Sequence, residues 1–94
     1  MAEAINCVNH AISGATTQNN QAQFDAMVDF TFNAGRGSFM SSTLLRLNNR
    51  GDHVGASAQF GLWVHAGGEV VAGLVRRRRD EAHLYSSGVL ANAA

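Results

Sequence analysis

The sequence has no proline, no lysine and a single cysteine. Without proline, glycine is left to mark the breaks between regular elements, and the chain has ten glycines. One cysteine, Cys7, excludes an intramolecular disulfide and cannot form a zinc site by itself. Its position in an apolar run favours a buried thiol.

Long apolar runs are missing as well. No stretch approaches the about 20 consecutive apolar residues that span a membrane, and the N-terminus lacks the pattern of a secretory signal peptide. The formal net charge is +0, so overall charge gives no reason to expect nucleic acid or an anionic membrane as a partner. With 46% hydrophobic residues, the 94-residue chain predicts one globular domain, 1–94, with one modest core.

Residues 23–35 carry the clearest helical pattern. Apolar or weakly polar side chains recur at the spacing of one helix face: Phe24, Met27, Val28, Thr31 and Phe32. The polar stripe on this helix is narrow and consists of Asp25, Asp29 and Asn33. So narrow a stripe predicts a helix covered by neighbours on several sides, which makes this the core helix, ended by Gly35.

The remaining segments predict an all-α fold of four or five helices around this buried helix. A helix is expected over residues 2–13, and residues 15–21 form a linker with four possible N-caps: Thr16, Thr17, Asn19 and Asn20. A third helix is expected from about 38 to 48, and a short one over 53–62 with Asp52 as its N-cap. Residues 65–73 predict an irregular loop or tight hairpin, 73–85 a last helix, and 86–94 a frayed tail.

Isolated catalytic motifs are weak. Asp25 and Asp29 are four residues apart on one helix edge, whereas the two carboxylates of a glycosidase flank the scissile bond from different sides. A solvated stripe is therefore favoured over a catalytic pair. The four histidines have no metal-ligand spacing, so neither a metal site nor a cofactor is expected.

Four consecutive arginines, 76–79, stand in the last predicted helix. Because consecutive helical residues point all round the axis, at least one of them must pack against the core with its charge paired. Arg76–Asp80 and Arg77–Glu81 are candidate pairs at i, i+4. The alternatives are an arginine that faces an anion or a sugar, or a cationic, membrane-active helix.

Three stretches together resemble the C-terminal lobe of phage-type lysozymes, the endolysins that cleave peptidoglycan: QAQFDAMVDFTFNAGRGSF, SSTLLRLNNRGDHVGASAQFGLW and HAGGEVVAGLVRRRRDEAHLY. The landmarks follow in order from about residue 6 to residue 85. The resemblance implies that residues 1–14 are the end of a helix joining two lobes, that 15–85 form one lobe, and that peptidoglycan is the partner. It also implies a protein made in the cytoplasm of a phage or prophage host, which acts on the periplasmic wall after release.

The catalytic region of that family has no counterpart here. The family uses a Glu, an Asp and a Thr around an EGxxLxAYxDxxGxxTIGYG region, and Glu3 is followed by no such pattern. No family catalytic residue can therefore be carried over. The leading hypothesis is a truncated lysozyme that contacts peptidoglycan without hydrolysing it alone. The alternatives are a minimal muramidase that uses acids of its own (Asp25, Asp29 or Glu69) or those of a partner chain, and a cationic membrane-active module.

The resemblance does carry over a substrate-facing surface, which consists of Phe32, Asn33, Gly35, Ser41 and Ser42. Phe32 offers an apolar platform, and Asn33 a donor and an acceptor for a sugar or peptide amide. The opposing interpretation makes Phe32 ordinary core and Asn33 a helix C-cap, and Trp63 is expected in the core. Asn48 stands where the family has an apolar residue, so either the helix rotates or Asn48 becomes semi-buried.

A lobe without its partner would expose the interlobe side of the first helix, with Ile5, Val8 and Ile12 as candidates. We therefore predict a dimer or a domain-swapped form at high concentration. Sedimentation at millimolar concentration checks this expectation, and a monomer throughout would contradict it.

Overall fold

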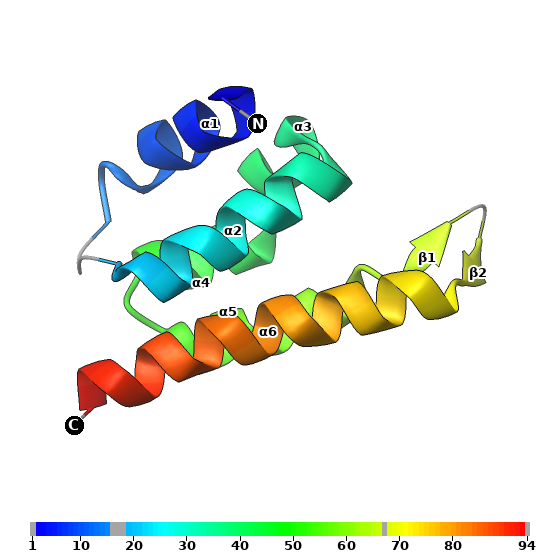
Figure 1. Ribbon diagram of the computed structural model, residues 1–94. Coiled ribbons are helices and arrows are strands. Elements are labelled where there is room, and N and C mark those ends of the chain that lie inside the picture. Colours follow the sequence, from blue (N-terminus) through cyan, green and yellow to red (C-terminus); the bar gives the residue numbers. More distant parts are fainter. Residues whose placement is uncertain (1, 16–18, 67, 94) are drawn as a thin grey trace.

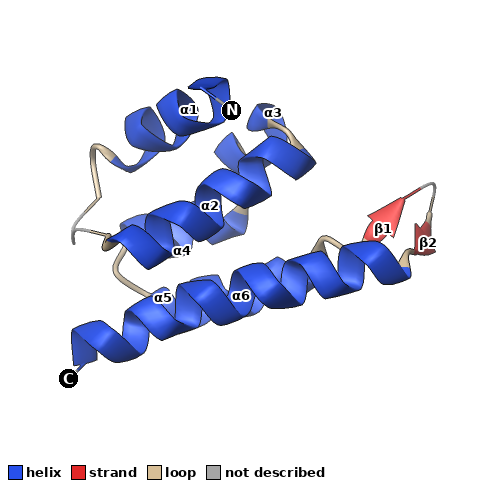
Figure 2. Cartoon of the chain, in the orientation of Figure 1, coloured by secondary structure: helices blue, strands red, loops and turns tan. Residues whose placement is uncertain are grey.

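The computed structural model describes residues 2–15, 19–66 and 68–93. In these ranges the order of elements is α1 (Ala2–Ile12), α2 (Gln21–Ala34), α3 (Arg36–Met40), α4 (Thr43–Asn49), α5 (His53–Gln59), η1 (Phe60–Leu62), β1 (His65–Ala66), β2 (Glu69–Val70) and α6 (Ala72–Ala93). Helices dominate the chain, as Figure 2 shows, and the predicted all-α class is confirmed.

Helix α2 is the central element. Figure 1 places it between α1 on one side and the long α6 on the other, with α3 at its C-terminal end. Its fully buried Phe30 meets three aromatic rings, with centroid distances of 6.4 Å to Phe39, 5.7 Å to Phe60 and 5.4 Å to Trp63. Edge-on and tilted aromatic contacts of this kind make α2 the centre of the core.

The buried face of α2 is rotated from the predicted one. The side chains it buries are Gln23, Ala26, Met27, Phe30 and Thr31. Phe24 and Val28 are half-buried and pack against the edge of the core, whereas Phe32 is 57% exposed, so the place of Phe32 in the predicted core face was wrong. The physical reason is that apolar residues surround most of this helix, and the ring of Phe30 meets the other aromatic residues of the core.

Local capping explains where the helices begin. Asn20 is the N-cap of α2: its side chain accepts from the Gln23 amide at 3.0 Å, and the Gln23 side chain accepts from the Asn20 amide at 3.1 Å. This reciprocal arrangement satisfies two amides at the start of the helix. Asp52 caps α5, as predicted. Two other predicted candidates for the α2 cap, Thr16 and Thr17, lie outside the described residues.

Two predicted segments differ from expectation, and a third follows one of its two predicted alternatives. The predicted third helix is split into α3 and α4 by Ser42, whose extended backbone and side chain start α4. Residues 65–70 form the hairpin alternative, with His65 paired to Val70 and Ala66 to Glu69. Helix α6 starts at Ala72 and continues to Ala93, so the backbone of residues 86–93 is helical where a frayed tail was expected.

Helix α1 exposes less apolar surface than the sequence indicated. Val8 is fully buried against the core and Ile12 is half-buried, while Ile5 is 39% exposed. The choice of Val8 as an exposed residue was therefore wrong, because α1 packs this side chain towards α2. The dimer stays a prediction that depends on the smaller surface around Ile5.

Asn48 lies fully buried at the centre of a polar network. Its Oδ1 accepts from the Tyr85 hydroxyl at 2.5 Å and from Asn19 Nδ2 at 2.7 Å, and its Nδ2 donates to Asn19 Oδ1 at 2.9 Å. Burial raises the pKa of Tyr85, which keeps its hydroxyl protonated as the donor. Asn48 is thus more deeply buried than the expected semi-buried side chain, because its amide is hydrogen-bonded on both sides.

Substituting Asn48→Ala should lower the free energy of unfolding by about 1–3 kcal/mol, because the Tyr85 hydroxyl and the Asn19 amide would lose buried partners. Urea denaturation followed by circular dichroism measures this change. The matched control is Asn6→Ala, at an exposed position of α1, which should stay within about 0.5 kcal/mol of the parent. Equal stability of Asn48→Ala and the parent would contradict the role of the network.

Candidate functional site

The C-terminal end of α2 brings two predicted site residues to the surface. Phe32 is 57% exposed and Asn33 is exposed beside it, so the interpretation of Phe32 as core was wrong. Asn33 is not the C-cap either, because Gly35 occupies that position with a φ of 106° and donates its amide to the Thr31 carbonyl at 2.9 Å. An aromatic face and an amide are thus both available at this end of α2.

The two serines of the predicted surface have different environments. Ser41 is exposed at the end of α3, and its hydroxyl donates to the Gly37 carbonyl at 2.9 Å. Ser42 is 5% exposed: its hydroxyl donates to the Phe39 carbonyl at 2.7 Å and accepts from the Leu45 amide at 3.1 Å. The Ser42 hydroxyl therefore caps the N-terminus of α4, and its hydrogen bonds stabilise the turn between α3 and α4.

A pocket of about 350 Å³ adjoins Asn33. It is lined by residues from three parts of the chain: Asn33, Ala34, Trp63, His65, Leu74 and Arg78. Trp63 belongs to the core and to the pocket wall at once, because its ring meets Phe30 while the side chain is only half-buried. Sequence reasoning missed His65 and Leu74, which come from the hairpin and the start of α6 and follow no helical spacing.

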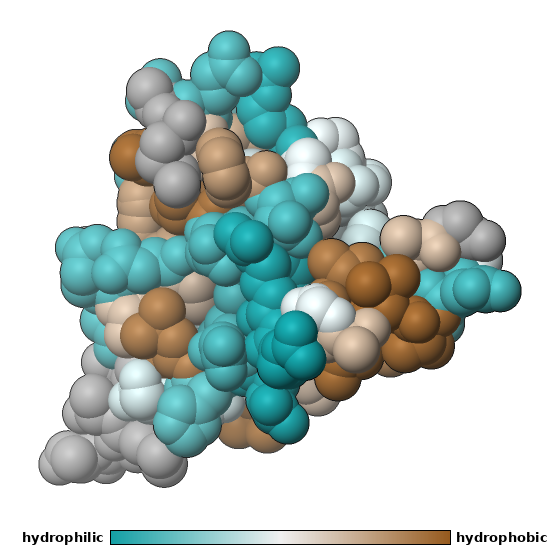
Figure 3. Space-filling model, turned by 45° about the vertical axis from the view of Figure 1, so that its right-hand side comes forward, coloured by the Kyte–Doolittle hydropathy of each residue, from teal (hydrophilic) through white to brown (hydrophobic). Residues whose placement is uncertain are grey.

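Several apolar side chains are exposed around the hairpin and the start of α6. Val70, Val71 and Val75 are exposed on β2 and at the start of α6, and Figure 3 shows an apolar patch beside the hairpin, next to a hydrophilic band. Small apolar patches of this size are common on protein surfaces.

The arginine run forms an ion cluster between α2 and α6. Arg78 is 1% exposed, with its Nε 2.7 Å from Glu81 Oε1 and its guanidinium 5.0 Å from the ring centroid of Phe30. Arg77 pairs with Asp29 at 3.0 Å and with Glu81 at 3.7 Å. The predicted packing of one arginine against the core and the Arg77–Glu81 pair are confirmed, and Asp29 is half-buried in this cluster instead of in an open solvated stripe.

In this cluster, the pKa values of the two carboxyl groups are shifted in opposite directions. Burial raises the pKa of Glu81 to about 8, its hydrogen bond with Asp29 adds to this, and the charge of Arg78 opposes it. The hydrogen bond with Glu81 lowers the pKa of Asp29, helped by Arg77. Glu81 can hold a proton near neutral pH, but at 3% exposure it is out of reach of a substrate.

The other two acids considered as catalytic are far apart. Asp25 is exposed near the start of α2 and accepts a hydrogen bond from Gln21 Nε2 at 2.6 Å. Glu69 is exposed on β2, which Figure 1 shows at the far end of the molecule from the start of α2. The structure therefore does not bring Asp25 and Glu69 to opposite sides of one bond, as glycoside hydrolysis requires.

The described residues also include no group of three or more His, Cys, Asp or Glu side chains that could hold a metal ion. In the same part of the chain, no helix combines the length and apolar character that a membrane crossing needs. The arrangement is that of a helical lobe with an exposed aromatic ring at the end of α2 and an amide that lines a small pocket.

Comparison with known proteins identifies the family of this lobe. The sequence profile described as phage lysozyme matches residues 1–81, so the chain belongs to the phage lysozyme family. The endolysin of Bacillus phage PZA is 45% identical over 87 residues, and that of Acyrthosiphon pisum secondary endosymbiont phage 1 is 37% identical over 91 residues; each alignment covers 93% of this chain.

A solved structure supports the same relationship. The muramidase domain of SpmX from Asticaccaulis excentricus superposes with a TM-score of 0.77 at 34% identity, over 88% of this chain and 57% of that one. The chain spans 33% of the length of the Bacillus phage endolysin and 60% of the length of the Acyrthosiphon phage endolysin. The shared region is thus one part of larger proteins.

Substituting Glu81→Gln should remove a pH dependence of stability. Since the pKa of Glu81 is raised from 4.5 to about 8 by folding, the folded chain binds this proton more tightly, and stability should fall as pH rises from about 4.5 to 8. Urea midpoints at pH 5 and pH 8 should differ for the parent and less for Glu81→Gln. Glu69→Gln, at an exposed acid, is the matched control and should keep the parent's slope. Equal slopes for parent and Glu81→Gln would contradict the assignment.

Proposed function

We propose that this chain is the C-terminal, substrate-contacting lobe of a phage-type lysozyme, and that it binds peptidoglycan without hydrolysing it alone. The observation that carries the proposal is the exposed end of α2, where the Phe32 side chain is exposed and Asn33 lines the Trp63 pocket. An apolar platform next to an amide that can donate and accept suits the glycan and its peptide. Gly35 and Ser41 extend this surface, while Ser42 supports it from below.

Hydrolysis of a glycosidic bond needs a carboxyl group that holds a proton and can reach the leaving oxygen. In the ion cluster, the raised pKa and the accessibility belong to different residues. Glu81 has the raised pKa but is buried, and Asp29 is partly accessible but has a lowered pKa and pairs with Arg77. The catalytic carboxyl groups are therefore proposed to come from residues outside these 94, in a second lobe that α1 would join to this one, or in a partner chain.

The membrane-active alternative is weakened by the pairing of the arginines. Arg77 pairs with Asp29 and Arg78 is buried against Glu81, which leaves Arg76 and Arg79 as the exposed members of the run. A surface helix that disrupts anionic membranes depends on a broader cationic face opposite an apolar one. The proposed site of action is the bacterial cell wall, through contact with its glycan.

The test combines binding and hydrolysis with purified sacculi. The 94-residue chain should pellet with sacculi and release no soluble muropeptides detectable by mass analysis. The double variant Phe32→Ala/Asn33→Ala should pellet about fivefold less, because both contacts lie at the centre of the proposed surface. Its matched control is Val54→Ala, an exposed apolar side chain on α5, which should bind as the parent does.

Two results would overturn the proposal. A robust release of disaccharide peptides by the parent would mean that this chain has reachable catalytic acids, and loss of that release in Asp25→Asn, Asp29→Asn or Glu69→Gln would identify them. Equal pelleting of the parent and the double variant would show that the end of α2 is not the contact surface.

A further inference from the structure

A second concave surface lies on another side of α2, between α1 and the N-terminal half of α2. This α1–α2 groove has a volume of about 540 Å³, within the range of ligand sites in proteins. Its lining combines four apolar side chains, Ile5, Ile12, Phe24 and Val28, with a polar rim of amides and one carboxylate. Neither the proposed contact surface nor the ion cluster uses these side chains.

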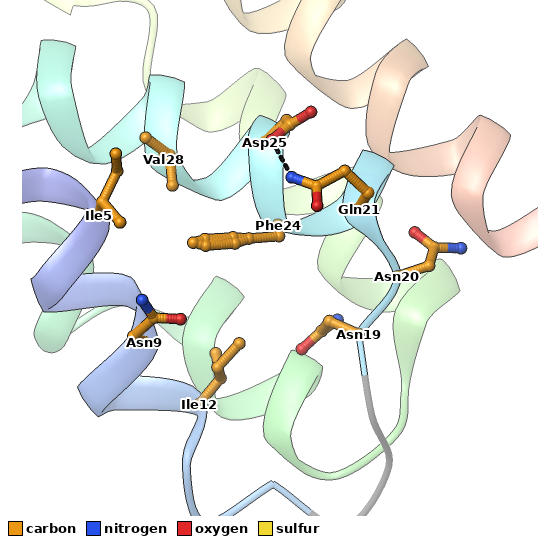
Figure 4. A pocket seen from close by; sticks show the side chains of 9 residues that line it. All are labelled: Ile5, Asn9, Ile12, Asn19, Asn20, Gln21, Phe24, Asp25 and Val28. Atoms are coloured by element: carbon orange, nitrogen blue, oxygen red, sulfur yellow. Dashed lines mark hydrogen bonds between the residues drawn. The ribbon is translucent and has the colours of Figure 1, made fainter.

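The four apolar side chains form the floor of the groove, which lies open between the facing surfaces of α1 and α2. Ile5, Asn9 and Ile12 follow one ridge of α1, and Gln21, Phe24 and Val28 follow the facing ridge of α2. Figure 4 shows the Phe24 ring extending across the space between them, with Val28 and Ile5 on one side and Ile12 on the other. A half-buried aromatic ring in an open groove offers its negative face to weakly positive C–H groups.

The rim consists of groups suited to a neutral ligand. Asn9 is exposed on α1, and Gln21 Nε2 donates to Asp25 Oδ1 at 2.6 Å on the α2 side. The Asn19 amide is held in place by Asn48, through contacts of 2.7 and 2.9 Å. No arginine or histidine is among the lining residues. A phosphate or another anion would therefore meet the Asp25 carboxylate with no cation to compensate it.

We propose that the α1–α2 groove is a second, non-catalytic binding site for an N-acetylated saccharide. An acetamido group presents one donor, one acceptor and a methyl group, which match the amide rim and the apolar floor. Sugar hydroxyls can donate to Asp25, and the C–H face of a pyranose can cover Phe24. The choice of an amino sugar rests on the proposed function, whereas the neutral character of the ligand follows from the lining itself.

The groove is separate from the end of α2. Phe24 and Asn33 are nine residues apart, which is two and a half turns, so they project from opposite sides of the helix and are separated by about 13 Å along its axis. One sugar ring cannot contact both. A glycan bound in the groove would attach the lobe to the wall at a point away from the proposed contact surface.

The experiment is a nuclear magnetic resonance titration of the 15N-labelled chain with chitotriose, the neutral trimer of N-acetylglucosamine. Amide shifts should move at Asn9, Gln21 and Phe24. The variant Asn9→Ala should lower the affinity about five- to tenfold, as expected for the loss of one hydrogen bond. Asn6→Ala is the matched control, because it removes the same side chain from an exposed position of α1 outside the groove.

Cellotriose, which lacks the acetamido groups, should bind more weakly than chitotriose. Equal affinity for the two sugars, or unchanged affinity in Asn9→Ala, would overturn the proposal. Shifts confined to Phe32, Asn33 and Trp63 would also overturn it, while leaving the proposed function intact. Groove shifts in a chain that fails to pellet with sacculi would support this site and count against the proposed function.

Discussion

The packing of α6 on α2 depends on one buried charge. Arg78 lies with its stem inside the core and its guanidinium over Phe30, and Glu81 lies 2.7 Å from its Nε. Taking the charge of Arg78 out of water carries a desolvation cost, so a buried charge of this kind persists only where polar and charged neighbours compensate it. The carboxylate of Asp29 supplies a neighbouring negative charge, and its pairing with Arg77 connects the two helices at this point.

This constraint also orients the surface proposed to contact glycan. The Arg77–Asp29 pair lies one turn before Asn33 on α2, and Arg78 lines the pocket that Asn33 and Trp63 share. The charges that hold α6 in place therefore hold the pocket wall as well. The same arrangement explains why the acids on this face are poor candidates for chemistry: their protonation states serve the contact between helices.

Much of the fold could be predicted from the sequence because helix signals are local. The central helix, the Gly35 break and the Asp52 cap all follow from residue types within one or two turns. The rotation of α2 could not be predicted, because apolar residues surround most of this helix and the choice between Phe30 and Phe32 is made by rings from α3, η1 and Trp63. Contacts with other helices therefore determine which face of α2 is buried, a choice that the spacing of its apolar residues does not make.

The candidate site was predictable to a smaller extent. The resemblance pointed to Phe32 and Asn33, and both are exposed. The roles of His65, Leu74 and Arg78 in the pocket depend on a hairpin that returns the chain to α2, and no sequence spacing encodes that return. Ser42 shows the opposite case, since a residue type that suits substrate binding serves as a helix cap.

The polar network around Asn48 bears on the order in which the chain can fold. Its bonds join residues separated by 29 positions (Asn19–Asn48) and 37 positions (Asn48–Tyr85). Closing two such loops costs chain entropy before either bond forms, so neither is available to an early, locally folded intermediate. The bonds of Asn48 to Asn19 and Tyr85 form only when the segment just before α2, helix α4 and the part of α6 that carries Tyr85 have met. That requirement couples both ends of the lobe into one cooperative unit.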